Sequence, residues 1–171
     1  MFLFNAFVFL CCLSLIVAQQ CNISPNVARV DCYPQDGASQ SGCESRQCCW
    51  RAPTVSSNLT DVNVPYCYFP SDFPTYQVVS NQSTDVGYRL RIVKSQKTYL
   101  PNEILDLTVD LIYETQQRLR IRIYDSNAKR FEVPIDVPTV TSKASTTDYD
   151  VQVQAKPFAI LVRRISTGTI L

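Results

Sequence analysis

The chain has 171 residues, with 16 Lys or Arg against 15 Asp or Glu, so its formal net charge is +1. The signs are mixed along the chain, which argues against a basic groove for nucleic acid or a polybasic patch for membranes. Histidine is absent. This excludes the serine and cysteine triads that depend on a histidine base, so any catalysis would have to use carboxylates. We expect no nucleic-acid partner and no cofactor.

The first 18 residues are apolar and uncharged, and they end at the small residue Ala18. This pattern predicts a secretory signal peptide over 1–18. A signal anchor is the alternative, because the run approaches the length that spans a bilayer. An anchor normally has Lys or Arg on its cytosolic side, and the first basic residue here is Arg29. We therefore expect cleavage, loss of Cys11 and Cys12 with the leader, and no membrane contact afterwards.

Six cysteines follow the leader within a short stretch: Cys21, Cys32, Cys43, Cys48, Cys49 and Cys67. A domain this small buries too little apolar surface to offset chain entropy, so it needs covalent cross-links. Three disulfides would supply about 2–4 kcal/mol each. Counting cysteines does not choose among the possible pairings. A zinc site is the alternative, but the absence of histidine and the adjacency of Cys48 and Cys49 favour disulfides over tetrahedral ligation. No metal is expected.

Three glycosylation sequons agree with the secretory pathway, where disulfides persist. Their acceptors are Asn22, Asn58 and Asn81, and Pro25 directly after the first sequon disfavours its use. The Asn81 sequon is expected in a polar stretch between two domains.

The prolines of residues 69–74 predict a stiff junction, because each proline fixes its own φ and restricts the residue before it. We therefore predict one domain over 19–70 and a second over 76–171. The second domain contains short runs of alternating polarity, which are typical of half-buried strands. Together they predict an antiparallel β-sandwich without long helices. The runs cover residues 89–92, 105–111, 118–123, 151–154 and 158–162.

Turn signals lie at 114–117 and 125–128, and the second predicts a hairpin that joins 118–124 to 130–135. The charged residues of the alternating runs are interpreted as a solvated sheet face. A paired-carboxylate site would need two acids that converge in a pocket, and alternation alone does not indicate convergence. The charged residues in question are Arg89, Arg91, Asp106, Asp110, Arg118, Arg120 and Arg122.

The cysteine spacing, with residues 29–34 and 43–50, resembles the trefoil, or P-type, domain. In that family Gly usually stands where this chain has Gln47, so the backbone there is less free to take a positive φ. The resemblance also implies a 1–5, 2–4, 3–6 pairing. The implied disulfides are Cys21–Cys49, Cys32–Cys48 and Cys43–Cys67.

The gap between Cys49 and Cys67, with residues 114–134 and 156–164, is similar to the N-terminal region of lysosomal acid α-glucosidase-like glycoside hydrolases. Maltase-glucoamylase and sucrase-isomaltase are relatives in that family. The resemblance implies a mainly β chain: a disulfide-knotted trefoil followed by a truncated galactose-mutarotase-like antiparallel β-sandwich. It also implies a secretory product, secreted or lysosomal.

The catalytic part of that family is not expected in this chain. The family's nucleophile lies in a Trp-Ile-Asp-Met-Asn-Glu-like segment of a barrel, whereas the only Trp here is Trp50, beside the cysteines. A barrel requires ~250 residues of alternating strand and helix. We therefore expect a non-catalytic N-terminal fragment of an α-glucosidase, whose parent reaction would be retaining hydrolysis of α-1,4-linked glucose by two carboxylates.

Two further functions stay open. The resemblance to trefoil peptides, which hold sugars in a cleft lined by an aspartate before the second cysteine and a Pro–aromatic pair before the last, implies a stand-alone, lectin-like trefoil with a sugar site at Asp31 and at Pro65 with Tyr66. In such a site the carboxylate would accept hydroxyl hydrogen bonds and the ring would stack on a sugar face. Glycans or α-glucans are thus the expected partners. The structural alternative is that Asp31 pairs with Arg29 or Arg46, that Tyr66 fills a gap between loops and that Trp50 covers disulfides. The other function is protein contact through unpaired strand edges, expected at 105–111 and 158–162, which predicts that 76–171 alone is poorly soluble or oligomeric.

Overall fold

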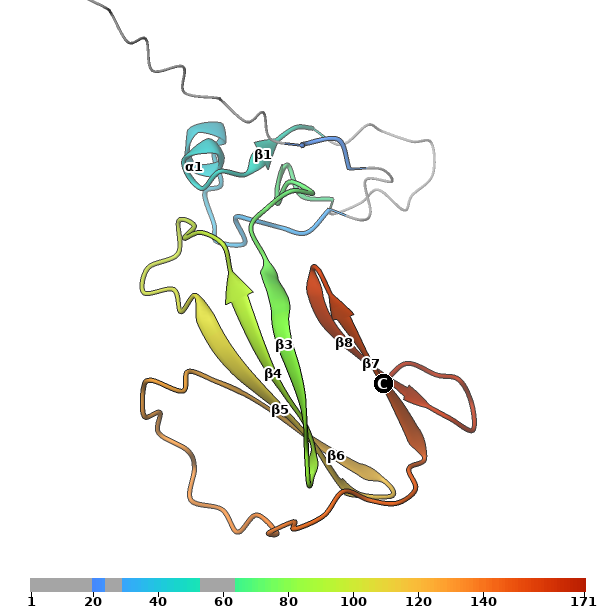
Figure 1. Cartoon of the computed structure of the whole chain (residues 1–171). Coiled ribbons are helices and arrows are strands. Elements are labelled where there is room, and N and C mark those ends of the chain that lie inside the picture. Colours follow the sequence, from blue (N-terminus) through green and yellow to red (C-terminus); the bar gives the residue numbers. More distant parts are fainter. Residues whose placement is uncertain (1–19, 24–28, 53–63) are drawn as a thin grey trace, which may run out of the picture. The chain divides into compact units, whose positions relative to one another are not determined.

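A computed structural model of the chain describes residues 20–23, 29–52 and 64–171 (Figure 1). The predicted signal peptide and Asn58 lie outside the described residues. The chain divides into two compact units. The first, called the cysteine unit below, comprises residues up to Glu44 and Cys48–Asp72. The second, the sheet unit, comprises Ser45–Gln47 and Phe73–Leu171.

The cysteine unit has little regular structure. Helix α1 spans Gln40–Ser45 and begins where the Ser39 hydroxyl accepts the Gly42 N–H at 3.1 Å, as a helix cap does. Two short strands, β1 (Cys49–Trp50) and β2 (Cys67–Tyr68), pair antiparallel. Asp31 forms an isolated bridge with Tyr68 on the other edge of β2. These short ladders leave most of the stabilisation to the cross-links.

Three disulfides join the six cysteines: Cys21–Cys49, Cys32–Cys48 and Cys43–Cys67. These are the pairs that the trefoil resemblance implies. The Cα atoms of each pair lie 5.5 to 6.5 Å apart, which is normal for a disulfide. Cys32, Cys43 and Cys48 are fully or almost fully buried, as is Tyr68. Sulfur and one aromatic ring therefore form the interior of this unit.

Gln47 has a φ of +59°, in the left-handed region where glycine is preferred. It follows α1, where a residue with positive φ commonly ends a helix. Gln47 is therefore held in a conformation that a glycine would adopt at lower cost in free energy.

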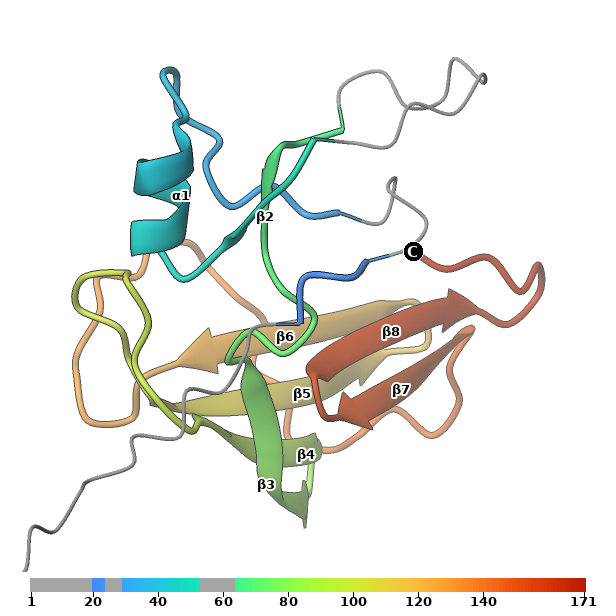
Figure 2. The same cartoon turned by 90° about the horizontal axis from the view of Figure 1, so that it is seen from above.

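The sheet unit is built of antiparallel strands. Four of them form one sheet in the order β3-β4-β5-β6, and β7 pairs with β8 in a separate hairpin (Figures 1 and 2). The chain is thus mainly β, as predicted from the sequence. The strands are β3 (Tyr76–Thr84), β4 (Gly87–Lys94), β5 (Asp106–Thr115), β6 (Arg118–Tyr124), β7 (Tyr149–Ala155) and β8 (Phe158–Arg164).

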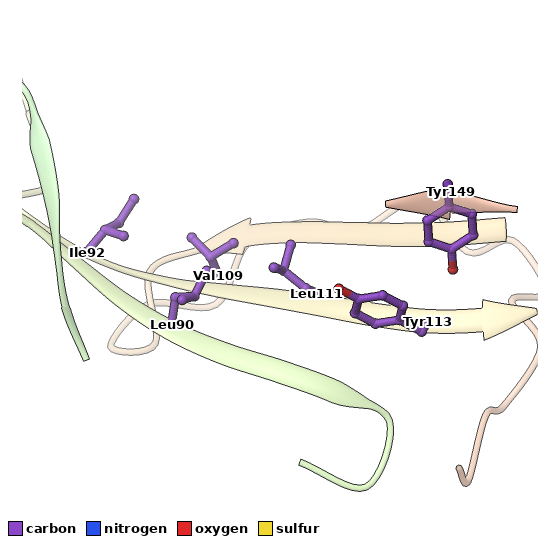
Figure 3. Close-up of a cluster of buried hydrophobic side chains, with 6 residues drawn as sticks. All are labelled: Leu90, Ile92, Val109, Leu111, Tyr113 and Tyr149. Atoms are coloured by element: carbon purple, nitrogen blue, oxygen red, sulfur yellow. The ribbon is translucent and has the colours of Figure 1, made fainter. Parts of the chain in front are cut away.

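One face of the four-stranded sheet carries the core. Leu90 of β4 lies opposite Val109 of β5, and Ile92 lies opposite Leu107, so these side chains share a face. Figure 3 shows Leu90, Ile92, Val109, Leu111 and Tyr113 along this face, with Tyr149 of β7 beside them. Apolar residues of the β7–β8 hairpin pack against the same cluster. The hairpin is therefore a second layer that covers the sheet. We call this covered side the inner face.

The segment between β6 and β7 is not the hairpin that the sequence predicts. Residues 130–135 form no strand, and Phe131 is 86% exposed. The prediction depended on the turn signal at 125–128, but Pro134 has no N–H to give to a ladder. Arg122 of β6 does reach Glu132, in an ion pair of 2.5 Å. The segment therefore runs beside the sheet without joining it.

The expectation about exposed edges is wrong for one of its two strands. The strand over 158–162 is part of β8, which, among the described strands, pairs only with β7 in a two-stranded sheet. The predicted strand over 105–111 is part of β5, which pairs with β4 on one side and β6 on the other. Its backbone is therefore fully engaged. The edges of this sheet are β3 and β6. The sequence did not predict β3, and the Asn81 sequon lies within this strand rather than in a stretch between two domains.

Candidate functional site

The predicted sugar-binding residues all belong to the cysteine unit. Asp31 is exposed, and its Oδ1 accepts the Tyr33 N–H at 2.8 Å, an Asx turn that fixes the side chain at the surface. Tyr66 directly precedes β2 and is 51% exposed. Pro65 is half-buried. The bridge between Asp31 and Tyr68 brings the strand that carries Asp31 alongside the strand that Tyr66 enters.

The Tyr66 ring contacts Trp50. Its ring centroid lies 5.8 Å from that of Trp50, at an interplanar angle of 48°. The two rings come from neighbouring strands, and the Arg51 N–H donates to the Tyr66 carbonyl at 2.9 Å. Trp50 is half-buried. The cysteine unit therefore presents a pair of aromatic rings at its surface, a kind of surface that suits contact with sugars. The pairing of Trp50 with Tyr66 was not predicted from the sequence.

Arg29 is a buried support for this surface. Its Nη1 donates to the Arg51 carbonyl at 3.1 Å and to the Pro65 carbonyl at 3.5 Å. Its guanidinium carbon lies 4.2 Å from the centre of the Tyr68 ring, within the range of a cation–π contact. The described contacts of Arg29 are thus with backbone carbonyls and a ring, not with Asp31. Arg29 ties together the chain segments that carry Trp50 and Tyr66.

Asp106 and Asp110 of β5 lie on the face opposite the core and are paired with arginines. Asp110 accepts two hydrogen bonds from Arg89, at 2.7 and 3.2 Å. Burial raises the pKa of Asp110, but hydrogen bonds from Arg89 and Tyr124 outweigh it, so the pKa is below its usual value. The hydrogen bond from Arg91 lowers the pKa of Asp106 as well. Acids held ionised in this way are poor proton donors. Arg89 and Arg91 are exposed, as the solvated-face interpretation expects, but Asp110 is buried, so that interpretation is wrong for Asp110.

A buried ion pair lies at the end of β4. The side chains of Lys94 and Glu103 are each only 7% exposed and contact one another. Glu103 also accepts hydrogen bonds from the Thr98 backbone N–H and from its hydroxyl. The hydrogen bond from Lys94, followed by that from the Thr98 backbone, lowers the pKa of Glu103 to about 2. Alternation in the sequence gave no signal for this pair, because Glu103 lies in the loop between β4 and β5.

We expect the Glu103→Gln variant to lose stability at neutral pH by about 2–3 kcal/mol, since a shift of one pKa unit corresponds to about 1.4 kcal/mol. The folded pKa of about 2 lies below the ordinary glutamate pKa of 4.5. The contribution of Glu103 is therefore complete above that value and disappears as the pH falls toward 2. Urea unfolding at pH 7, 5 and 3 tests this. The difference between wild type and variant should narrow at pH 3.

A control separates ionisation from simple packing. In the double variant Lys94→Met/Glu103→Leu no buried charge remains without a partner, so it should be more stable than Glu103→Gln at pH 7. A difference between wild type and Glu103→Gln that stays constant from pH 7 to pH 3 would contradict the assigned role of the carboxylate.

The glycosylation acceptors are placed as follows. Asn22 is exposed in the cysteine unit, and Asn81 is exposed in β3.

Within the described residues no group of three or more Cys, Asp or Glu side chains is arranged to hold a metal ion. The described part of the chain also contains no helix long and apolar enough to cross a membrane.

Comparison with known proteins gives two kinds of match. Residues 21–70 match the family described as Trefoil (P-type) domain. Lysosomal alpha-glucosidase of Rattus norvegicus is 36% identical over 155 residues, which make up 91% of this chain and 16% of the relative. Intestinal sucrase-isomaltase of Homo sapiens is 33% identical over 151 residues, 84% of this chain and 8% of the relative.

Probable maltase-glucoamylase 2 of Homo sapiens is 28% identical over 175 residues, 92% of this chain and 7% of the relative. The chain thus spans a sixth or less of the curated relatives that it matches. The chain contains a trefoil (P-type) domain, and most of its length is similar to the N-terminal part of lysosomal α-glucosidase and sucrase-isomaltase.

Proposed function

We propose that this chain is a non-catalytic N-terminal segment of an α-glucosidase-type glycoside hydrolase that travels the secretory pathway to the lysosome or the cell exterior. Its task is to contact α-glucan chains through the trefoil while a catalytic part elsewhere in the polypeptide cleaves them. The similarity over nine-tenths of this chain to rat lysosomal alpha-glucosidase supports the parent activity. The contact between the exposed Tyr66 ring and the half-buried Trp50 ring supports the contact role.

The observation that carries the contact role is the exposure of Tyr66 beside Trp50, with the Asp31 carboxylate at the surface of the same unit. Aromatic rings interact with the apolar C–H face of a glucose unit, and a carboxylate accepts hydrogen bonds from its hydroxyls. The disulfides and Arg29 hold these groups before any sugar arrives. A preorganised surface loses less conformational entropy on binding than a mobile one.

We expect Tyr66→Ala to abolish binding of maltotriose, because it removes the exposed stacking ring. Tyr66→Phe should retain binding, since it keeps the ring. Asp31→Asn should weaken binding about 10-fold by the loss of a charged acceptor, while its amide oxygen still accepts the Tyr33 N–H. The measurement is NMR titration of the full chain with maltotriose, followed at the Trp50 indole N–H. The control is Val30→Ala, because Val30 is next to Asp31 and is also exposed. This variant should bind maltotriose with the wild-type affinity.

If the chemical shift of the Trp50 indole N–H did not change as maltotriose was added, the contact role would be overturned. The parent activity is tested separately by mass spectrometry of the native source, where a longer product is expected. A mature protein of this length as the sole form would instead favour the stand-alone, lectin-like trefoil. Release of glucose from maltose by the purified chain at an enzymatic rate would contradict its non-catalytic assignment.

A further inference from the structure

A cavity of about 610 Å³ lies in the sheet unit between the inner face of the sheet and β7. This volume is in the range of about 300–1,000 Å³ that is typical of small-molecule sites. Its lining includes the three tyrosines Tyr88, Tyr113 and Tyr149. It also includes Asn81, the acceptor of a glycosylation sequon. The combination places an attachment point for a sugar in the wall of an aromatic cavity.

A β-bulge directs Asn81 to this side. In β3 the pairing with β4 shifts register between Val78 and Ser80. Val78 lies opposite Ile92 and so faces inward, and regular alternation would therefore turn Asn81 outward. The extra residue at the bulge reverses this, so that Asn81 lies opposite the buried Leu90 and shares its face. The position of Asn81 in the cavity is thus a product of the bulge.

The tyrosine rings form an extended aromatic wall. The centroids of Tyr88 and Tyr113 lie 6.0 Å apart with an edge-to-face angle of 70°. Those of Tyr113 and Tyr149 lie 5.9 Å apart and are stacked. Figure 3 labels both residues at one end of the buried cluster. The Tyr149 hydroxyl is within hydrogen-bonding distance of the Thr115 and Arg118 carbonyls, which fixes that ring.

Polar groups complete the lining. Ser145, Thr147 and Asp150 offer hydroxyl and carboxylate oxygens. The exposed Lys143 places its Nζ 4.3 Å from the Tyr113 ring centre and 4.9 Å from that of Tyr88. A long, solvent-facing lysine moves at little cost, so it leaves the ring faces accessible to another group. Rings with surrounding hydrogen-bonding groups match the two kinds of surface on a pyranose.

We propose that Asn81 carries an N-linked glycan whose first N-acetylglucosamine lies in this cavity against Tyr88, and that this sugar forms part of the packing between the sheet and the β7–β8 hairpin. The transfer forms a bond between Asn81 Nδ2 and C1 of the sugar. It breaks the bond from C1 to a lipid-diphosphate donor, and Nδ2 loses one proton. The modification takes place on the unfolded chain, so the location of Asn81 in a strand does not prevent it.

The test uses the full chain, secreted from eukaryotic cells that incorporate ¹³C-labelled N-acetylglucosamine. Intact mass establishes whether Asn81 is occupied. If the sugar lies against the rings, its N-acetyl methyl protons are shifted upfield by ring currents, and the shift should decrease in Tyr88→Leu. Ser83→Ala removes the sequon but leaves Asn81 and the tyrosines in place, whereas Ser83→Thr keeps the sequon and is the matched control.

Hydrogen exchange provides the second readout. The Ala144 N–H donates to the Tyr113 carbonyl at 3.0 Å, at the edge of the cavity. We expect this amide to exchange about 10-fold faster in Ser83→Ala than in wild type or Ser83→Thr, because local opening becomes easier by about 1.4 kcal/mol. Asn22→Gln, which removes a sequon in the cysteine unit, should leave it unchanged. An unmodified Asn81, or an occupied Asn81 with an unshifted methyl group and unchanged exchange, would overturn the proposal.

Discussion

Replacement of Gly87 by alanine is expected to destabilise the sheet unit by about 4 kcal/mol or more. Gly87 begins β4 with a φ of +151°, and a Cβ added there would lie 2.0 Å from the Leu111 carbonyl oxygen. It would also lie 2.9 Å from the Tyr113 ring. The carbonyl is backbone of the central strand β5 and cannot move aside without breaking the ladder. Backbone strain and overpacking each cost about 1–3 kcal/mol, so their sum approaches the stability of a small domain.

The control is Gly168→Ala. Gly168 also has a positive φ, of +70°, but an added Cβ would meet nothing within 4 Å. The Gly168→Ala substitution should therefore lower the free energy of unfolding by only about 1 kcal/mol, which is the cost of the backbone conformation without a steric clash. Thermal unfolding followed by circular dichroism compares the two variants. If Gly87→Ala melted within a few degrees of Gly168→Ala, the close approach of β4 and β5 at this point would not be a constraint on the fold.

Removal of the Cys43–Cys67 disulfide in the double variant Cys43→Ala/Cys67→Ala is expected to unfold the cysteine unit at 37 °C. The bridge joins residues 24 positions apart, and losing a native disulfide from a small secreted domain costs about 2–5 kcal/mol. In residues 20–23, 29–52 and 64–72, the regular structure that opposes this loss is a six-residue helix and two-residue strands. Substitution of both cysteines prevents a free thiol from exchanging with the other two bridges.

Hydrogen exchange with peptide resolution is the appropriate measurement, because it reports on both units in one sample. Peptides from residues 29–52 should lose protection, whereas those from β4 and β5 should keep it. Protection of the cysteine unit at the wild-type level would show that two bridges suffice. Loss of protection in β4 and β5 would show that the two units unfold together.

The sequence predicted most strands of the sheet unit because their alternation reports burial on one face. Leu90 and Ile92 alternate with Arg89 and Arg91, and the structure places the first pair in the core and the second outside. The alternation of Phe131, Val133 and Ile135 has the same appearance, but no layer covers these residues. Periodicity records which side chains could share a face, and it does not record whether another element packs there.

Strand β3 was missed for the opposite reason. Its second half, Ser80–Thr84, is polar because the inner face is open at that point, next to the cavity. A strand that buries little apolar surface carries no period-two signal. The bulge at Val79 is also invisible to such a pattern, since one inserted residue reverses every later orientation. The side of the sheet on which Asn81 lies could therefore not be predicted.

The candidate site was predicted in part. Asp31, Pro65 and Tyr66 were chosen through the resemblance to trefoil domains, and the structure exposes Asp31 and Tyr66 at the surface of one unit. The contact of Trp50 with Tyr66 depends on the register of β1 and β2, which two-residue strands do not reveal in a sequence. The support given by Arg29 likewise depends on carbonyls of residues distant in the chain.

All six paired cysteines lie in the cysteine unit, and residues 73–171 contain none. Thiol reagents therefore act on one half of the described chain only. A cell that folds this polypeptide needs oxidoreductases for the first half, while the second half condenses through its apolar face alone. Folding defects in the cysteine unit should accordingly respond to the redox poise of the compartment. Folding defects in the sheet unit should instead respond to chaperones that recognise exposed aliphatic strands.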